Sequence, residues 1–70
     1  MKQRVGDKKR KQVEAKLGRP IRSMWARGGR NPRYWDVFFG EEDDDEGEFG
    51  YWYPQLERLE MTNEKWRRTL

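Results

Sequence analysis

The chain has 70 residues, of which 33% are hydrophobic and 41% are charged, with a formal net charge of +3 and a mean hydropathy of −1.41. So short and polar a chain can form one small domain at most, because the cost of ordering it is close to the stabilisation from its apolar burial. It contains no cysteine and no histidine, which excludes disulfide bonds and thiolate metal sites and removes the commonest general base. We therefore expect a binding protein with no catalytic residues, no cofactor and no metal site.

The charge is distributed unevenly along the chain. Residues 1–33 carry twelve Lys or Arg and two acids, a net charge of +10, whereas residues 34–56 carry eight acids and no base, and residues 57–70 have a net charge of +1. This division predicts a basic, arginine-rich segment over 1–33 and a second segment, 34–70, that combines an aromatic and acidic hairpin with a helix. The basic segment indicates an anionic partner, which is nucleic acid, an acidic protein face, a membrane surface or the chain's own acidic run.

The first predicted element is a short helix that begins with Asp7 as its N-cap, runs to about Leu17 and stops at Gly18 and Pro20. Because a helix of about ten residues is marginal in water unless it docks, we expect the basic N-terminus to be partly disordered. A run of four bases lies within this helix and is typical of nuclear import signals and phosphate-binding surfaces, and equally of a solvated helix face. These four residues are Lys8, Lys9, Arg10 and Lys11.

A basic, hairpin-like segment follows. Residues 21–27 are predicted as a strand and Gly28-Gly29 as a turn into residues 30–35, where Pro32 would confine the second strand to a sheet edge. Arginine pairs with phosphate and guanine, and aromatic rings stack on unpaired bases. We therefore predict nucleic-acid contacts from Arg19, Arg22, Arg27, Arg30, Arg33, Trp25 and Tyr34. The alternative is that these aromatic residues, together with Trp35, form a core and that the arginines pair with the acidic run.

Two aromatic runs, 34–39 and 49–53, favour β-strands and can pair with each other. Their connection includes six consecutive acids, Glu41 to Glu46. This run lacks the alternating ligands and the glycine turn of a calcium loop. We expect a solvated acidic loop, or one that folds back on the arginine segment and competes with nucleic acid.

The last predicted element is an amphipathic helix over residues 55–70, because Pro54 suits a first helical position and no further Pro or Gly follows. Its apolar stripe would comprise Leu56, Leu59, Trp66 and Leu70, either as part of a small core or as an exposed face. A related set of apolar residues, spaced 4, 3 and 2 apart, can instead fill successive pockets of a partner's groove. This set is Trp52, Leu56, Leu59 and Met61.

That spacing is similar to a leucine-rich nuclear export signal, and residues 54–61, Pro-Gln-Leu-Glu-Arg-Leu-Glu-Met, resemble the export segment of lentiviral Rev proteins. Rev proteins also place an arginine-rich segment for RNA binding and nuclear import upstream of the export signal. The resemblance implies a viral shuttle that carries RNA to an exportin and is found in both nucleus and cytoplasm.

These patterns predict a small α+β fold and a small RNA-binding adaptor, which binds RNA through the arginine segment and a protein partner, or a second copy, through the C-terminal helix. The alternative is a protein-binding inhibitor or host-factor-interacting viral protein that uses its acidic loop and an aromatic patch; a subunit of a ribonucleoprotein particle is a third hypothesis. No stretch approaches about 18 apolar residues and the N-terminus lacks an apolar signal region, so we expect an intracellular protein without membrane contact. The predicted patch comprises Trp35, Phe38, Phe39, Tyr51, Trp52 and Tyr53.

Overall fold

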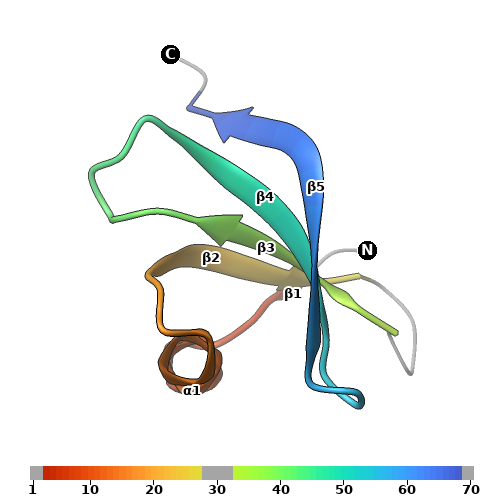
Figure 1. The fold of residues 1–70 in the computed structure, drawn as a ribbon. Coiled ribbons are helices and arrows are strands. Elements are labelled where there is room, and N and C mark those ends of the chain that lie inside the picture. Colours follow the sequence, from red (N-terminus) through yellow and green to blue (C-terminus); the bar gives the residue numbers. More distant parts are fainter. Residues whose placement is uncertain (1–2, 28–32, 69–70) are drawn as a thin grey trace.

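The computed structural model describes residues 3–27 and 33–68, and in these ranges it contains one helix and five strands (Figure 1). The strands form a single antiparallel sheet in the order β1-β2-β3-β4-β5. Each strand from β1 to β4 therefore pairs with the next strand along the chain. The elements are β1 (Gln3–Arg4), α1 (Asp7–Leu17), β2 (Ile21–Ala26), β3 (Trp35–Phe39), β4 (Glu46–Tyr53) and β5 (Arg58–Arg67).

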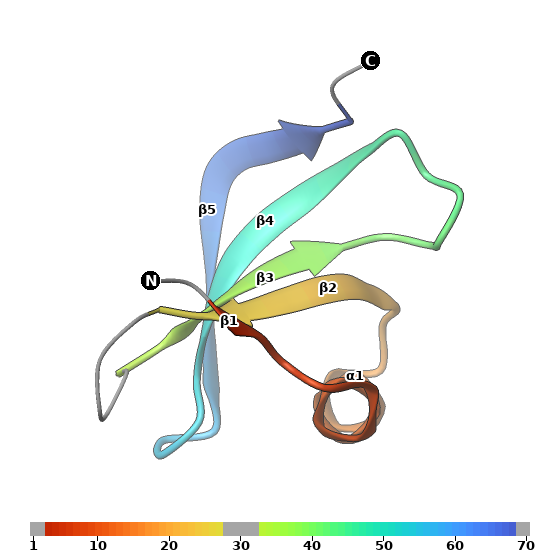
Figure 2. The same ribbon diagram turned by 180° about the vertical axis from the view of Figure 1, so that it is seen from behind.

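The helix α1 lies against one face of the sheet, below β2 and β3 in Figure 1 and again on one side in Figure 2. It begins at Asp7 with Gly6 as its N-cap, so Asp7 is the first helical residue and not the predicted cap. It ends at Gly18, whose left-handed backbone (φ 68°, ψ 28°) lets its N–H donate to the Glu14 carbonyl at 2.9 Å. The expectation of a partly disordered basic N-terminus is wrong for residues 3–27, because the helix docks on the sheet.

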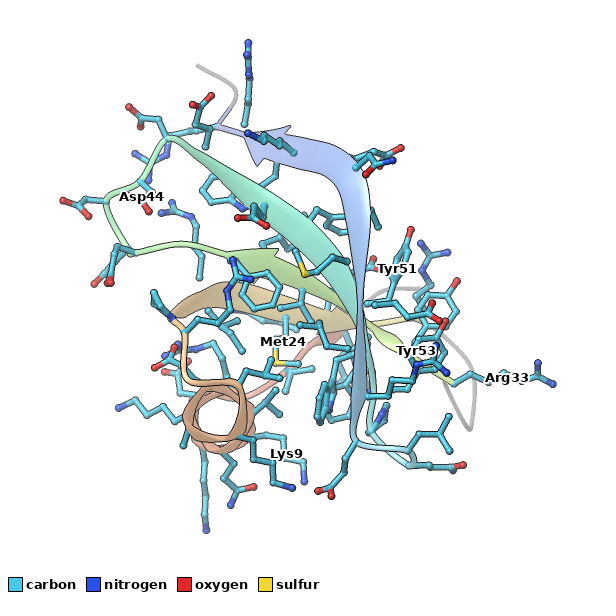
Figure 3. The ribbon with its side chains drawn as sticks, viewed as in Figure 1. Lys9, Met24, Arg33, Asp44, Tyr51 and Tyr53 are labelled. Carbon is cyan, nitrogen blue, oxygen red and sulfur yellow. The ribbon has the colours of Figure 1, made fainter. Side chains whose placement is uncertain are left out.

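The hydrophobic core lies between α1 and the sheet, where Figure 3 places Met24. Met24 of β2 and Val37 of β3 are paired in register and fully buried. Val5, Leu17, Trp35 and Leu59 pack around this core as partly buried residues. The buried apolar side chains are Val13, Ile21, Met24, Val37, Phe39 and Trp52.

The predicted aromatic strands are present and paired: Trp35 lies opposite Trp52, and Val37 lies opposite Gly50. The strand predicted over residues 21–27 is also present as β2, and it pairs with β3 from Ile21 to Ala26. Strands from both predicted segments, 1–33 and 34–70, therefore lie side by side in one sheet. The predicted Gly28-Gly29 turn and Pro32 fall outside the described residues.

The predicted C-terminal helix is wrong, and with it the predicted fold class. Residues 54–57 form a turn in which Glu57 has a φ of 49°, and the chain returns as strand β5 along β4. Apolar and polar residues alternate from Arg58 to Thr62, which is the period of a strand with one buried face. The helical spacing of Leu56 and Leu59 was misleading, because Leu56 lies in the turn, 69% exposed, whereas Leu59 packs against the core.

Two helix side chains occupy the edge of the sheet beside Ile21. Arg10 Nη1 donates to the Ile21 carbonyl at 2.8 Å and to Glu14 Oε2 at 3.0 Å, and the Ile21 N–H donates to the same Glu14 oxygen at 2.8 Å. A backbone edge is usually bonded by a neighbouring strand or by water, and an unpaired edge invites aggregation. At this position the side chains of α1 bond the backbone of β2 as a neighbouring strand would. Hydrogen bonds therefore hold the helix on the sheet together with the apolar contacts of the core.

We expect Glu14→Ala to destabilise the protein by about 1–3 kcal/mol, because it leaves the half-buried Ile21 N–H and Arg10 guanidinium without their shared acceptor. Urea unfolding followed by circular dichroism measures the change. Lys11→Ala, on the exposed side of the same helix, is the matched control and should change stability by no more than about 0.5 kcal/mol. Equal stability of the two variants would show that the Arg10–Glu14–Ile21 bonds do not stabilise the fold.

Candidate nucleic-acid interface

The sheet has a second face, opposite α1, which we call the open face. The strand alternation places Phe38 of β3 and Phe49 of β4 on it as a register pair, on the side opposite Val37. Figure 3 shows Tyr51 and Tyr53 projecting away from Met24 and from the helix. In the part of the chain that the structure describes, no element lies over this face (Figures 1 and 2).

An unbroken row of five aromatic rings crosses the open face; we call it the aromatic row. Successive ring centroids are 5.1, 5.1, 5.0 and 5.5 Å apart, with edge-to-face or tilted geometry. All five side chains are half-buried, so each ring keeps part of its surface in solvent. Because neighbouring rings and the strand register fix their positions, a ligand that stacks on them orders little further structure. In sequence along the row they are Phe38, Phe49, Tyr51, Tyr34 and Tyr53.

Arg27 lies beside Tyr34, near the Tyr53 end of the aromatic row. Its Nε is 3.3 Å from Oδ1 of Asp36, and its guanidinium carbon is 5.1 Å from the centroid of the Tyr34 ring. Asp36 is fully buried, and its charge raises the pKa of the Arg27 guanidinium. The buried carboxylate therefore positions an exposed cation against a half-buried aromatic ring. The exposed Arg33 projects on the same side of the molecule in Figure 3.

Tyr53, Glu60 and Arg58 form a small polar group at the same end. The Tyr53 hydroxyl donates to Glu60 Oε2 at 3.1 Å, and Arg58 Nη2 is 3.4 Å from the other Glu60 oxygen. Partial burial, followed by the hydrogen bond to Glu60, raises the pKa of the Tyr53 phenol. The phenol therefore stays neutral at physiological pH, and Arg58 adds a third cation near this end of the row.

The opposite end of the aromatic row, at Phe38, adjoins the acidic loop formed by residues 41–46. Arg22 Nη1 donates to the carbonyls of Glu41 at 3.0 Å, Asp44 at 3.1 Å and also Glu42. The Arg22 guanidinium carbon also lies 5.2 Å from the Trp66 ring. The acidic loop thus folds back on one predicted arginine through its backbone carbonyls, and competition between this loop and nucleic acid stays a prediction.

At this end, Trp66 packs closely against the backbone of Phe39 and Gly47. Its indole N–H donates to the Phe39 carbonyl at 2.8 Å. Gly47 lies directly beneath, where an added Cβ would be 2.1 Å from that carbonyl oxygen and 2.7 Å from the indole nitrogen. Only glycine fits at residue 47, and the strand pair β4 and β5 can therefore carry Trp66 next to Phe38.

The predicted nucleic-acid residues do not form one surface. Arg10 bonds the sheet edge, and Arg19 lies on the helix side, where its guanidinium carbon is 4.0 Å from the Phe39 ring centroid and its Nη2 is 3.4 Å from Glu48. Lys8, Lys9 and Lys11 are exposed on α1, and Figure 3 shows Lys9 far from Tyr51 and Tyr53. The structure brings Arg22, Arg27 and Tyr34 to the open face, together with half-buried Trp25, the register partner of Asp36. Arg30 lies outside the described residues.

The open face also contains aromatic residues that the nucleic-acid prediction missed and that the alternative patch included in part. Phe38, Tyr51 and Tyr53 of that patch lie on the open face, whereas the other three members lie on the core side. Successive side chains of a strand point to opposite faces, so alternation along the two aromatic runs distinguishes the open-face residues from the core-side residues. The core-side members are Trp35, Phe39 and Trp52.

The predicted partner-binding stripe is dispersed. Trp52 is 4% exposed in the core, Leu59 packs against it, and Met61 is 41% exposed on β5. Leu56 lies in the turn. A helix that presents these four side chains to a groove does not form. The resemblance of residues 54–61 to an export signal stays a prediction that these placements do not test.

Among the described residues, no cluster of three or more carboxylates is placed to bind a metal ion, and no helix is both long and apolar enough to cross a membrane. Comparison of the chain with protein-family models, with curated proteins and with solved structures found no match.

The raised pKa of Tyr53 gives a titration that can be measured. In a Tyr34→Phe/Tyr51→Phe variant, Tyr53 is the one remaining tyrosine, and its phenolate absorbance should appear above the ordinary pKa of about 10. A phenol whose pKa is raised by folding stabilises the fold fully below that ordinary value, and this stabilisation is lost as the pH rises through the folded pKa. Adding Glu60→Leu, which removes the carboxylate acceptor, should lower the pKa; no change would remove the contact with Glu60 as a cause.

Proposed function

We propose that the protein binds single-stranded nucleic acid, RNA in particular, on the open face of its sheet. The observation that carries this proposal is the aromatic row together with Arg27, Arg33 and Arg58 at its Tyr53 end. Aromatic rings stack on unpaired bases irrespective of sequence, and arginine pairs with phosphate oxygens and also stacks on base planes. Both chemistries meet on one rigid surface.

A single strand suits this surface better than a duplex. In a duplex the base faces are stacked on each other, and rings that lie half-buried in a sheet cannot reach them. An unpaired strand offers its base faces, each of which contributes about 1–3 kcal/mol when it stacks on an aromatic side chain. The row is already ordered by ring packing, which lowers the entropic cost of binding.

The lysines of α1 have a separate role in this proposal. They lie across the core from the open face, so they cannot contact the same few nucleotides as Tyr51 or Arg27. Their positive charge raises the rate of encounter with an anionic strand and adds binding that is strongly salt-dependent.

The test is the affinity for a ten-nucleotide oligouridine, measured by tryptophan fluorescence at about 150 mM salt. Tyr51→Leu preserves an apolar side chain on the strand but removes the ring, and should weaken binding about tenfold. Arg33→Ala should weaken binding and reduce the slope of log affinity against log salt by about one. Lys11→Ala, on the opposite side of the molecule, is the control and should change affinity by less than about twofold.

Unchanged affinity of the Tyr51→Leu variant, with its circular dichroism spectrum intact, would remove the aromatic row from the interface. Tighter binding to a duplex of the same length would contradict a single-stranded ligand. Failure to bind any oligonucleotide would favour the alternative function, in which the open face and the acidic loop bind a protein. Parallel titrations with oligodeoxythymidine separate RNA from DNA.

A further inference from the structure

We propose that the open face binds only a short unpaired stretch of about three nucleotides, with its phosphates at the Tyr53 end. The carboxylates of the acidic loop repel phosphates near Phe38, and the site therefore ends there. This inference rests on the proposed function and adds the length and placement of the ligand. It predicts a protein that reads strand ends or small loops and does not coat long single strands.

The two ends of the aromatic row differ in charge. At the Tyr53 end, Arg27 pairs with Asp36 and Arg58 pairs with Glu60, and the exposed Arg33 projects on the same side of the molecule in Figure 3. At the Phe38 end lie three arginines, against the six acids of the loop. Figure 3 shows Asp44 and Tyr53 on opposite sides of the sheet's length, so the electrostatic potential changes sign along the row.

The arginines at the Phe38 end are already occupied by the acidic loop. Arg22 donates to three loop carbonyls, Arg67 Nε is 3.5 Å from Glu46 Oε2, and Arg68 Nη1 is 3.6 Å from Asp45 Oδ1. These side chains line a shallow cavity of about 240 Å³ whose aromatic walls would suit a base. A phosphate there would have to displace loop contacts and approach surplus carboxylates. The cavity is lined by Arg22, Ser23, Phe38, Trp66, Arg67 and Arg68.

Hydrogen bonds hold the negatively charged acidic loop in place. The Glu41 N–H donates to Asp44 Oδ2 at 2.8 Å, the Asp44 N–H donates to the Glu41 carbonyl at 3.1 Å, and the Gly40 N–H donates to the Pro20 carbonyl at 3.2 Å. The side chains of Glu41, Glu42 and Asp43 are exposed. Their charge acts over about 8 Å at physiological salt, which reaches phosphates near Phe38 and leaves the Tyr53 end unaffected.

The length of the site follows from the strand. From Phe49 to Tyr53 there are four residue steps of about 3.4 Å, or about 14 Å in all. Aromatic side chains on a sheet of this kind stack about two or three bases. Nucleotides beyond that number would have to pass the acidic loop or leave the surface.

The experiment measures affinity for oligouridines of two, three, four, six and ten nucleotides at about 150 mM salt. Affinity should rise up to about four nucleotides and then increase by no more than about fourfold up to ten, because a site for three nucleotides has about two binding positions on a tetranucleotide and about eight on a decanucleotide. The loop variant E41Q/E42Q/D43N spares Asp44 and Asp45, because the Asp44 carboxylate accepts from the Glu41 N–H and the Asp45 carboxylate pairs with Arg68. It should raise affinity for the ten-nucleotide strand at least fivefold and leave the trinucleotide within about twofold.

The matched control is D7N/E48Q/E57Q, which removes three carboxylates away from the open face: Asp7 and Glu48 lie near Arg10 and Arg19, and Glu57 pairs with Lys16. It changes the net charge equally and should raise affinity for both lengths by the same modest factor. A rise well above about fourfold from four to ten nucleotides, or an equal response to the two triple variants, would overturn the short site and leave the proposed function standing. Binding to none of the oligonucleotides would overturn both.

Discussion

The fold depends on how α1 completes one side of the sheet. The Arg10 and Glu14 side chains form hydrogen bonds with the backbone of Ile21. Val13 of the same helix belongs to the core cluster that contains Met24. A sheet of five short strands must bury at least one face to be stable. With a single helix in the described residues, only one face can be covered. The second face is therefore in contact with water or with a ligand. Its amino-acid composition indicates which of the two it is suited to.

That second face does not have the polar composition that a solvated sheet face usually has. Its β3 and β4 positions hold aromatic residues and a buried aspartate, with arginines at the margins. The rings are half-buried and no other described element covers them, and contiguous apolar surface left in contact with solvent is typical of binding surfaces. The edge-to-face or tilted packing of the rings, at about 5 Å between centroids, shields part of each ring and fixes its position. Burial of Asp36 has the same consequence for Arg27, because a buried carboxylate restricts its cationic partner.

Much of the local structure could be predicted from the sequence, because it follows from strong short-range signals. The Gly18 stop, strand β2 and the pairing of the two aromatic runs are such cases. The prediction of a C-terminal helix failed because Leu56 and Leu59 have helical spacing, whereas the alternation from Arg58 to Thr62 fits a strand. The pairing of this segment with β4 decides between the two. The candidate site was predicted in part. Arg27 and Tyr34 lie on the open face, but Arg10 and Arg19 do not, since their positions depend on which face α1 covers.

Many of the basic and acidic residues that are separated along the sequence contact each other in the folded chain. Arg22, Arg67 and Arg68 meet the acidic loop, Arg19 meets Glu48, and Lys16 meets Glu57. The net charge of +10 in residues 1–33 therefore overstates the free positive surface, because several of those bases have anionic partners in the same chain. Among the described residues, two groups of exposed bases bear on binding of an external anion: the lysines on α1, and the arginines near the Tyr53 end of the aromatic row, of which Arg27 and Arg58 keep carboxylate partners. Only the second group lies next to rings that can stack on bases, which is why the open face, and not the most basic stretch of sequence, is where we place the ligand.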